Sequence, residues 1–572
     1  MLTLLAPKHM GEAVRKTLQR METEQIVHRI WQHDYTVWKE EPEEIANRLN
    51  WLHAPEMMGH GLAEIGEVVE AVRRDGLEQA LLLGMGGSSL APEVFSRTLG
   101  VRPGYLNLEI LDSTHPATVR EKEHQFPPEK TLYIVSTKSG GTVETLSFMK
   151  YFYRRAVHRL GREEASRRFV AITDPGSGLE QLARELNFRH IFLNDPEVGG
   201  RFSALTYFGL VPAMFMGINV DWLLDRAQQM RMEAMVLSGL AEGQNAPAYL
   251  GAILGALAQS GRDKLTLIIS PGLAAFGAWL EQLIAESTGK EGRGILPVDG
   301  EPLFQPEHYR EDRLFVYLRL EGGSGFDGAV NALAQAGHPV VQIDLRDTHD
   351  LGGEMFRWEF ATAVAGWCLG INPFDQPNVE AAKAQARQAL EAYRSSGALP
   401  EPPPVLEKDG LTVIGEGIAS DSPEAALREF LESGTAQADR EIPCPYLSIQ
   451  AYLPSSPEVD QALQELRHTL LTQTRLATTV GYGPRFLHST GQLHKGDAGK
   501  GLFIQITDDP VEDLPIPDTP EEDAAAVRFG TLIRAQALGD YRALVQAGRR
   551  VIRLHFREDA AGGIRRLAKA LR

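Results

Sequence analysis

The chain has 572 residues, which is too long for one hydrophobic core and predicts two to four domains. Apolar residues make up 43% and charged residues 23%, the usual balance of a soluble globular protein. The formal net charge of -18 argues against a nucleic-acid partner, although a local cluster of donors can still bind an anionic substrate.

The cysteine content and the N-terminus predict the compartment. Cys368 and Cys444 are too few for a disulfide framework and lack metal-ligand spacing. The N-terminus has no signal-peptide layout, and the most apolar windows are shorter than a membrane span. We therefore expect a cytoplasmic protein without a membrane partner.

The first part of the chain alternates between short apolar runs and helical segments. Residues 1–57 predict an amphipathic helical segment. The apolar runs that follow are 79–85, 106–112, 131–137, 168–174 and 190–193. Such alternation is typical of a parallel sheet with helices on both faces. The pattern returns in the runs 264–270, 313–320 and 339–345, with helices at 274–287 and 354–369. The fold class predicted is therefore α/β, with two doubly wound parallel-sheet units.

A proline-rich connector then interrupts the pattern. Residues 397–410 hold four prolines, which favour a stiff, extended linker. Beyond it, the segments 446–453, 458–472, 500–508 and 531–548 predict a third, smaller α/β domain, and 508–523 predicts an exposed acidic loop. The predicted units are a helical segment 1–57, domains 58–225 and 226–396, a linker 397–410, and a C-terminal domain 411–572.

Two loops follow predicted strands at the sheet edge where parallel sheets bind ligands. They read "GMGGSS" (84–89) and "STKSGGT" (136–142). Neither has the spacing of a dinucleotide or nucleotide fingerprint, and either alone can be a packing turn. Together their glycines, hydroxyls and single cation favour a phosphate-monoester site. The candidate phosphate ligands are Gly86, Gly87, Ser88, Thr137, Lys138, Ser139 and Thr142.

Three further stretches carry charged residues in specific settings. Arg201 lies in "EVGGRFSALTYFG", Glu286 ends the apolar helix "WLEQLIAES", and Lys383 lies in "LGINPFDQPNVEAAK". A carboxylate can move a proton between adjacent carbons through an enediolate, and a fixed cation can stabilise its oxygen. Each also has a structural alternative. Glu286 can pair with Lys290, Arg201 can serve an ordinary ion pair, and Lys383 can be a solvated helix residue.

Taken together, "GMGGSSLAPE", "STKSGGTVET", "GGRFS", "ESTGKEGRG" and "LGINPFDQPNVEAAK" resemble the glucose-6-phosphate isomerase family. The resemblance covers roughly residues 60–395 and implies two SIS (sugar isomerase) domains. It implies a phosphate pocket from the two loops, Glu286 as isomerisation base, Arg201 beside the reacting carbons and Lys383 assisting ring opening. More narrowly, the C-terminal region resembles the isomerase half of fused transaldolase–isomerase proteins.

The helper histidine of that family lies in an "L-H-S-x-G-Q" motif about twenty residues after the glutamate. Residues 295–318 lack this motif, which occurs instead in "RFLHSTGQLHKG" (485–496). The matching residue is His488, so the third domain must fold back onto the site of the same or a neighbouring subunit. His308, near the expected position, is the rival, and a structural role for His488 also stays open.

The function predicted is reversible isomerisation of glucose 6-phosphate and fructose 6-phosphate, with no metal and no redox cofactor. The alternatives are a dual glucose/mannose phosphate isomerase and a non-catalytic sugar-phosphate sensor. The family's dimers, whose sites are built from two subunits, predict a homodimer. A weaker expectation is that the C-terminal segment binds a separately encoded transaldolase.

Overall fold

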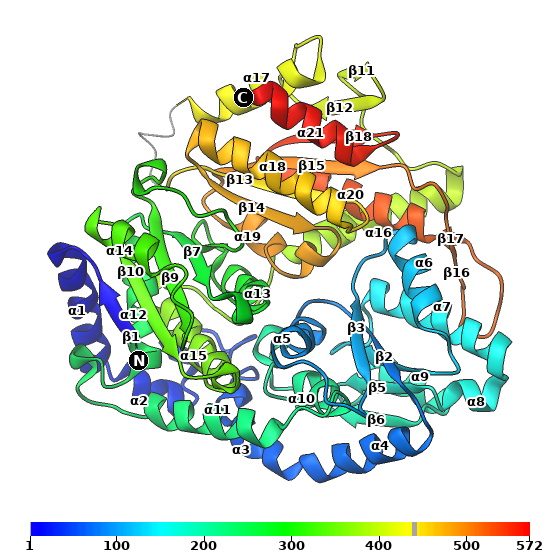
Figure 1. Cartoon of the computed structure of the whole chain (residues 1–572), viewed down its shortest axis with the longest axis horizontal. Coiled ribbons are helices and arrows are strands. Elements are labelled where there is room, and N and C mark those ends of the chain that lie inside the picture. The colour runs from blue at the N-terminus through cyan, green and yellow to red at the C-terminus, as the bar shows by residue number, and fades with distance from the viewer. Residues whose placement is uncertain (1, 437–442) are drawn as a thin grey trace.

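The computed structural model describes residues 2–436 and 443–572, so residues 437–442 of the predicted C-terminal domain lie outside the described residues. In the described residues, three sheets of five, five and six strands are each flanked by helices (Figure 1), and a fourth sheet has two strands. Among the described residues, no helix is long and apolar enough to cross a membrane.

The first unit is built on a five-stranded, wholly parallel sheet in the order β3-β2-β4-β5-β6. Its strands are β2 (Gln79–Gly84), β3 (Asn107–Leu111), β4 (Thr131–Ser136), β5 (Phe169–Thr173) and β6 (His190–Leu193). Strands β2, β4 and β5 are almost continuously apolar and buried, as expected for a sheet covered on both faces. Its helices are α4 (Leu62–Arg74), α5 (Leu90–Leu99), α6 (Pro116–Gln125), α7 (Val143–Leu160), α8 (Arg162–Ser166), α9 (Gly178–Glu185) and α10 (Tyr207–Phe215).

The second unit has a five-stranded sheet in the order β1-β10-β9-β7-β8, parallel except for β1. Its strands are β1 (Leu2–Leu5), β7 (Lys264–Ile269), β8 (Leu296–Val298), β9 (Arg313–Leu320) and β10 (Val340–Leu345). Strand β1 comes from the segment expected to be helical, and its apolar residues cover the edge of β10. The helices are α11 (Val220–Ala234), α12 (Ala246–Gln259), α13 (Phe276–Thr288), α14 (Asp327–Gln335), α15 (Leu351–Leu369) and α16 (Val379–Ser396). Helix α11 spans the expected boundary between the first two domains.

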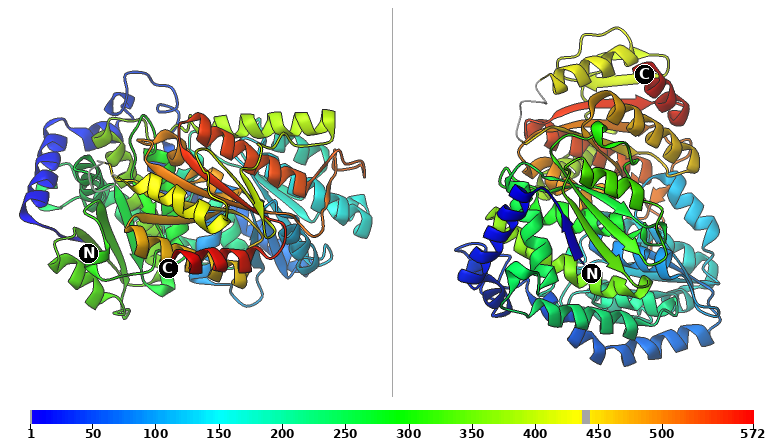
Figure 2. Two further views of the ribbon diagram at one scale, coloured as in Figure 1. Left: turned by 90° about the horizontal axis from the view of Figure 1, so that it is seen from above. Right: turned by 60° about the vertical axis from the view of Figure 1, so that its left-hand side comes forward.

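The remaining N-terminal helices, α1 (Lys8–Thr23), α2 (Ile26–Trp31) and α3 (Ala54–Met57), pack on the second unit and on α11. Their buried residues join the same hydrophobic core as α12 and α15. The N-terminal strand β1 is the edge strand of the second sheet, as the right-hand view of Figure 2 shows.

The third unit has a six-stranded sheet in the order β11-β12-β18-β15-β13-β14. Its strands are β11 (Leu406–Lys408), β12 (Leu411–Gly415), β13 (Tyr446–Tyr452), β14 (Ala477–Tyr482), β15 (Gly501–Asp508) and β18 (Arg550–Phe556). The last four are parallel to one another, and β12 pairs antiparallel with β18. The helices are α17 (Pro423–Thr435), α18 (Pro457–Thr474), α19 (Gly491–Gly496), α20 (Phe529–Gln546) and α21 (Ala560–Leu571).

The third unit lies across the other two rather than at the end of a free linker (Figure 1). A hairpin of β16 (Pro515–Ile516) and β17 (Val527–Arg528) reaches over α7 of the first unit. Leu514, Ile516 and Phe529 join that unit's hydrophobic core. The stretch 508–523 is therefore only partly the exposed loop that was predicted, because two of its apolar residues are buried.

Candidate functional site

The two hydroxyl-rich loops lie side by side at the carboxyl ends of β2 and β4. The first forms a short 3-10 helix, η4 (Gly86–Ser88), and the second leads into α7. Strands β2 and β4 are hydrogen-bonded neighbours, and Ser136 Oγ donates to the carbonyl of Ser88 over 3.0 Å. The sheet thus brings the predicted phosphate loops together.

The glycines of the first loop are required by close packing. Gly86 has a positive φ of 54°, and a Cβ there would lie 2.8 Å from Gln282 Nε2 and 3.0 Å from His488 Cβ. A side chain on Gly87 would collide with the carbonyl of Gly200. The loop therefore contacts the second and third units at once, which only residues without a side chain allow.

The hydroxyl groups of the second loop differ in exposure and in hydrogen bonding. Thr137 and Thr142 are hydrogen-bonded to each other through their Oγ1 atoms, 2.9 Å apart. Ser139 is exposed and accepts from the Gly141 amide over 3.3 Å. Lys138 pairs with Asp174 and donates to the carbonyl of Pro196, so its ammonium is already held beside the loop.

Arg201 and Glu286 meet across the first and second units. Arg201 lies in the 3-10 helix η5 (Gly200–Phe202), and its Nη1 is 3.1 Å from Glu286 Oε1 at the end of α13. Its remaining N–H groups reach Ser287 Oγ (2.8 Å), Gln376 Oε1 (3.0 Å) and two backbone carbonyls. All five guanidinium donors thus have acceptors, and the side chain is only 3% exposed.

The structure also separates Glu286 from its sequence neighbour Lys290. Lys290 Nζ lies 2.7 Å from Asp375 Oδ1, and its pKa is lowered to about 8 by burial and by the nearby Arg201 charge. The alternative pairing of Glu286 with Lys290 is therefore wrong, because Asp375 holds the lysine and Arg201 holds the glutamate.

His488 reaches the loops from the third unit of the same chain. It ends the 3-10 helix η10 (Arg485–His488), and its carbonyl accepts from Gln282 Nε2 over 2.8 Å. Its ring Nε2 lies 3.0 Å from Glu144 Oε1 at the start of α7. The fold-back that the relocated motif implies thus occurs within one chain.

Glu144 is a buried carboxylate at this junction of the first and third units. Burial raises its pKa, but the charge and hydrogen bond of His488, together with the charge of Lys383, outweigh burial, so the net pKa is lowered. Gln536 of α20 also donates to Glu144 Oε1, over 2.7 Å. The carboxylate therefore stays ionised and able to accept the Nε2 proton of His488.

The other two predicted residues are placed less centrally. Lys383, on α16, is about half exposed and its Nζ is 2.9 Å from Glu380 Oε1, yet it is close enough to lower the Glu144 pKa. His308 lies in a 3-10 helix, η8 (Pro306–His308), where its ring packs on Phe304. Phe304 in turn packs on His468 of α18, so His308 is held in an aromatic cluster rather than against the loops.

Three residues at this junction were not predicted. Gln282 lies one turn before Glu286 on α13 and donates to its Oε2 over 3.0 Å. Side chains four residues apart on a helix are neighbours, so the predicted helix could have indicated this contact. Glu144 stands within "STKSGGTVET", but its side-chain partners His488 and Gln536 lie far along the chain. Gln536 lies 392 residues from Glu144 and carries no sequence signal.

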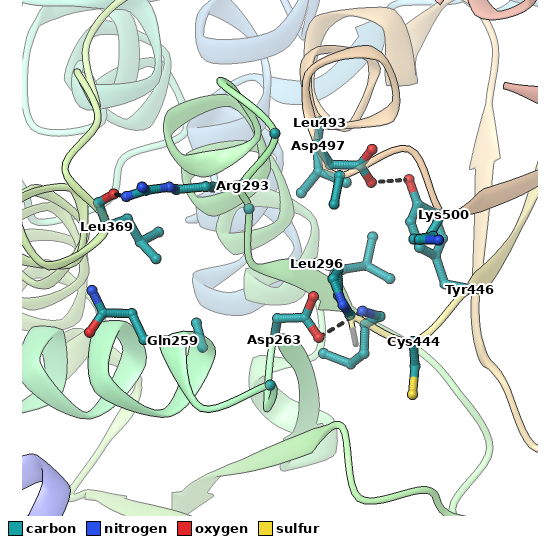
Figure 3. Close-up of a pocket in the computed structure, with 17 residues that line it drawn as sticks. Gln259, Asp263, Arg293, Leu296, Leu369, Cys444, Tyr446, Leu493, Asp497 and Lys500 are labelled. Atoms are coloured by element: carbon teal, nitrogen blue, oxygen red, sulfur yellow. Dashed lines mark hydrogen bonds and ion pairs between the residues drawn. The ribbon is translucent and has the colours of Figure 1, made fainter. Parts of the chain in front are cut away.

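A separate cavity of about 350 Å3 lies between the second and third units (Figure 3). Its polar side chains are paired with near neighbours: Lys264 is 2.7 Å from the adjacent Asp263, and Tyr446 donates to Asp497 of the same unit over 2.9 Å. None of the predicted site residues lines it. The candidate site is therefore the junction around Gly86, Glu286 and His488.

Solved structures place this arrangement in a known fold class. A hypothetical protein from Thermus thermophilus matches 68% of this chain and all of its own length, with 25% identity and a TM-score of 0.58. A glucose-6-phosphate isomerase from Chlamydia trachomatis matches 70% of this chain and 90% of its own, with 20% identity and a TM-score of 0.58. The protein therefore has the α/β fold of the SIS-type sugar-phosphate isomerases, as predicted.

Sequence relatives narrow the class. The family model for phosphoglucose isomerase matches residues 65–294. The glucose-6-phosphate isomerase of Rubrobacter xylanophilus is 32% identical over 381 residues, 58% of this chain and 87% of the relative. That of Enterococcus faecalis is 30% identical over 289 residues, 44% of this chain and 64% of the relative. The chain belongs to the glucose-6-phosphate isomerase family, and the narrower likeness to fused transaldolase–isomerase proteins stays a prediction.

Proposed function

We propose that the protein interconverts glucose 6-phosphate and fructose 6-phosphate, a reaction of glycolysis and gluconeogenesis. The observation that carries the proposal is the Glu286–Arg201 pair, 3.1 Å apart, at the junction with both hydroxyl-rich loops. Membership of the glucose-6-phosphate isomerase family supports it. A sugar-phosphate sensor would need the loops but would not need a carboxylate base beside a fixed cation.

The two loops hold the phosphate in this proposal. The backbone amides of Gly86 and Gly87 and the hydroxyls of Ser88, Thr137 and Thr142 supply donors to an anion, while the Ser88 amide already donates to the carbonyl of Met85. Ser139 is exposed at the rim of the second loop. Lys138 adds its positive charge from beside the loop, where Asp174 fixes it. The phosphate is the inert end of the substrate, so these contacts bind and orient the reacting carbons.

Glu286 carries the proton in the isomerisation step. In the aldose-to-ketose direction its carboxylate removes the proton at C2, the C2–H electrons form the C1–C2 double bond of the enediolate, and the carbonyl electron pair moves to O1. The O2 proton passes to O1 as C2 becomes the carbonyl carbon, and the same carboxylate returns the first proton to C1. Arg201 cannot turn toward the substrate without losing a partner, because all five of its donors are engaged. It therefore stabilises the enediolate oxygen as a fixed charge and holds Glu286 in place.

Ring opening falls to His488, assisted by Lys383. With Nε2–H directed at Glu144, Nδ1 is the atom of His488 that gives a proton to the ring oxygen of the sugar as the C1–O bond breaks, while the C1 hydroxyl releases its proton to water. Lys383 contributes a positive charge near this pair. The assignment parallels the use of a carboxylate to orient a histidine in other enzymes.

One experiment tests the proposal. The protein is incubated with fructose 6-phosphate in heavy water, and glucose 6-phosphate, mannose 6-phosphate and deuterium at C1 are followed by NMR. We expect glucose 6-phosphate and deuterium exchange with the wild type, loss of both in Glu286→Gln, and loss of isomerisation of the cyclic substrate in His488→Ala. A wild type that forms neither aldose and exchanges no deuterium would overturn the proposal. Formation of mannose 6-phosphate as well would show the dual glucose/mannose phosphate isomerase activity.

The remaining expectations rest on the sequence alone. A homodimer and an association with a separate transaldolase follow only from the resemblance, and a cytoplasmic location follows only from the sequence pattern. We propose that a dimer, if formed, is not needed to complete the site, because Arg201, Glu286 and His488 already meet within one chain.

A further inference from the structure

The carboxylate that holds His488 is itself held from the third unit. Glu144 Oε1 accepts two hydrogen bonds, from His488 Nε2 at 3.0 Å and from Gln536 Nε2 at 2.7 Å. Glu144 and Gln536 are each only 4% exposed. One carboxylate oxygen therefore serves both the histidine and a buried amide.

The far end of the Gln536 amide is fixed as well. Thr114 Oγ1 donates to Gln536 Oε1 over 2.7 Å, and Thr114 is fully buried. Ionised Glu144 can only accept, so the amide must turn its Nε2 toward Glu144 and its Oε1 toward Thr114. Thr114, Gln536, Glu144 and His488 thus form one chain of hydrogen bonds with a single direction.

The helix that carries Gln536 is locked on the helix that carries Glu144. Phe529, the first residue of α20, packs on Phe148 and Tyr151 of α7, with ring centroids 6.0 and 5.6 Å apart. The Gly530 amide donates to Asp513 Oδ1 over 2.7 Å, which ties the start of α20 to the hairpin over α7. Gln536 therefore cannot move independently of Glu144.

We propose that Gln536 is a positioning residue for ring opening: it fixes Glu144 in the orientation that holds His488 against the substrate. This inference rests on the proposed function, because it concerns the step assigned to His488. Among the described residues, the hydrogen bonds of the Gln536 side chain go to Glu144 and Thr114, so it reaches His488 through Glu144. Thr114 acts one step further back, by fixing the orientation of the Gln536 amide.

Replacing Gln536 is expected to lower kcat and to change its dependence on pH, while substrate binding is retained. The charged or titratable groups near Glu144 are His488, Lys383 and Tyr452. Removing the Gln536 amide removes a donor that stabilises the Glu144 charge, so the pKa of Glu144 rises. Activity that needs ionised Glu144 is then lost at a higher pH on the acid side.

The test compares Gln536→Leu, Gln536→Glu and Thr114→Val with Gln546→Leu, which changes an exposed glutamine on the same helix. We expect Gln536→Leu to lower kcat about tenfold or more, with KM within about twofold, and to move the acid limb of kcat to higher pH. Gln536→Glu puts a second carboxylate beside Glu144, so its acid limb moves further. Gln546→Leu leaves kcat and KM unchanged.

A double-variant cycle separates positioning from general destabilisation. If Thr114 acts through Gln536, Thr114→Val lowers kcat in Gln536 protein but has no further effect in Gln536→Leu. Equal binding of an acyclic five-carbon aldonic acid phosphate to all variants, measured by calorimetry, shows that the site is intact. Wild-type kcat and an unmoved acid limb in both Gln536 variants would overturn the inference while leaving the proposed function standing. An inactive wild type would instead overturn the proposed function.

Discussion

Arg201 is a buried cation with every donor engaged, and this distinguishes its role from that of a mobile substrate ligand. Its guanidinium forms an ion pair with Glu286 and donates a hydrogen bond to Gln376, both in the second unit. Burial lowers its pKa, while the charges of Glu286 and Asp375 oppose that effect. The side chain therefore provides a fixed positive charge and a rigid orientation for Glu286, which only a planar five-donor group can supply here.

Replacing this arginine by lysine tests the role at the residue scale. Arg201→Lys keeps the charge but has three donors on a point ammonium, so Glu286 loses its fixed partner. We expect kcat/KM to fall by about 100-fold or more. Arg319→Lys is the control, because Arg319 also pairs with a carboxylate, Asp327, but takes no part in the site. Steady-state kinetics decide, and an Arg201→Lys enzyme within about threefold of wild type would contradict this role.

At the scale of elements, the site depends on how closely η4 approaches its neighbours. Gly86 combines a left-handed backbone with contacts to Gln282 and His488. Gly76 has a similar φ of 72°, but a Cβ added there would meet nothing within 4 Å, so it isolates the backbone effect. Comparing alanine variants at Gly86 and Gly76 therefore separates the cost of backbone strain from the cost of lost close packing at the site.

We expect Gly86→Ala and Gly76→Ala to cost about 1 kcal/mol or more of stability each, because both force alanine into the left-handed region. Only Gly86→Ala is expected to lose most activity, since its methyl group displaces Gln282 or His488. Thermal unfolding and initial rates measure the two effects. Equal loss of activity in both variants would mean that the close approach at Gly86 is not what the site requires.

The sequence predicted most elements because their patterns are local. The apolar run 79–85 became β2, and the helix expected at 274–287 became α13, within two residues. Strand β14 was missed because "ATTVGY" is rich in threonine and glycine, and β18 because arginine and histidine interrupt its apolar residues. Those polar residues are accommodated by long-range partners that no local window contains.

The same limit applies to the site. Glu286 and His488 were found because each stands in a local motif, and their roles stay proposals. Whether His488 reaches the site from the same chain could not be predicted, since its contacts with Glu144 and Gln282 join residues more than 200 positions apart. Gln536 was missed for the same reason: its partners Thr114 and Glu144 lie in the first unit, several hundred residues away in the sequence. A single glutamine within a helix gives no sign of such partners.

At the scale of the whole molecule, the third unit is docked through partly buried charges. Arg485, at the start of η10, pairs with Glu93 and with Asp112 of the first unit. Glu281 of α13 accepts from Ser489 over 3.4 Å, and burial, together with the nearby Asp299, raises its pKa to about 7. The interface around His488 therefore contains a carboxyl group that folding makes harder to ionise.

This raised pKa predicts a dependence of stability on pH. Glu281 releases its proton near pH 4.3 when unfolded and near pH 7 when folded, so the folded state binds more protons between these values. Its contribution to stability therefore falls as the pH rises from about 4.5 to 7 and stays low above that. We expect Glu281→Gln to gain about 1–2 kcal/mol relative to wild type between pH 4.5 and pH 8.

Urea unfolding at pH 4.5 and pH 8 measures this difference. Glu67→Gln is the control, because Glu67 lies exposed on α4 and is expected to show no change with pH. If Glu281→Gln is destabilised equally at both pH values, the carboxyl group acts only as a hydrogen-bond acceptor of Ser489.

The central claim is that one chain supplies both Glu286 and His488 to a single site. Mixing two inactive variants tests it directly. Chains carrying Glu286→Gln and chains carrying His488→Ala are unfolded and refolded together in equal amounts, and isomerase activity on fructose 6-phosphate is measured. The account predicts no activity above the sum of the separate variants, because every site then retains one defect. Recovery toward a quarter of wild-type activity, as a site shared between two subunits of a dimer would give, would contradict it.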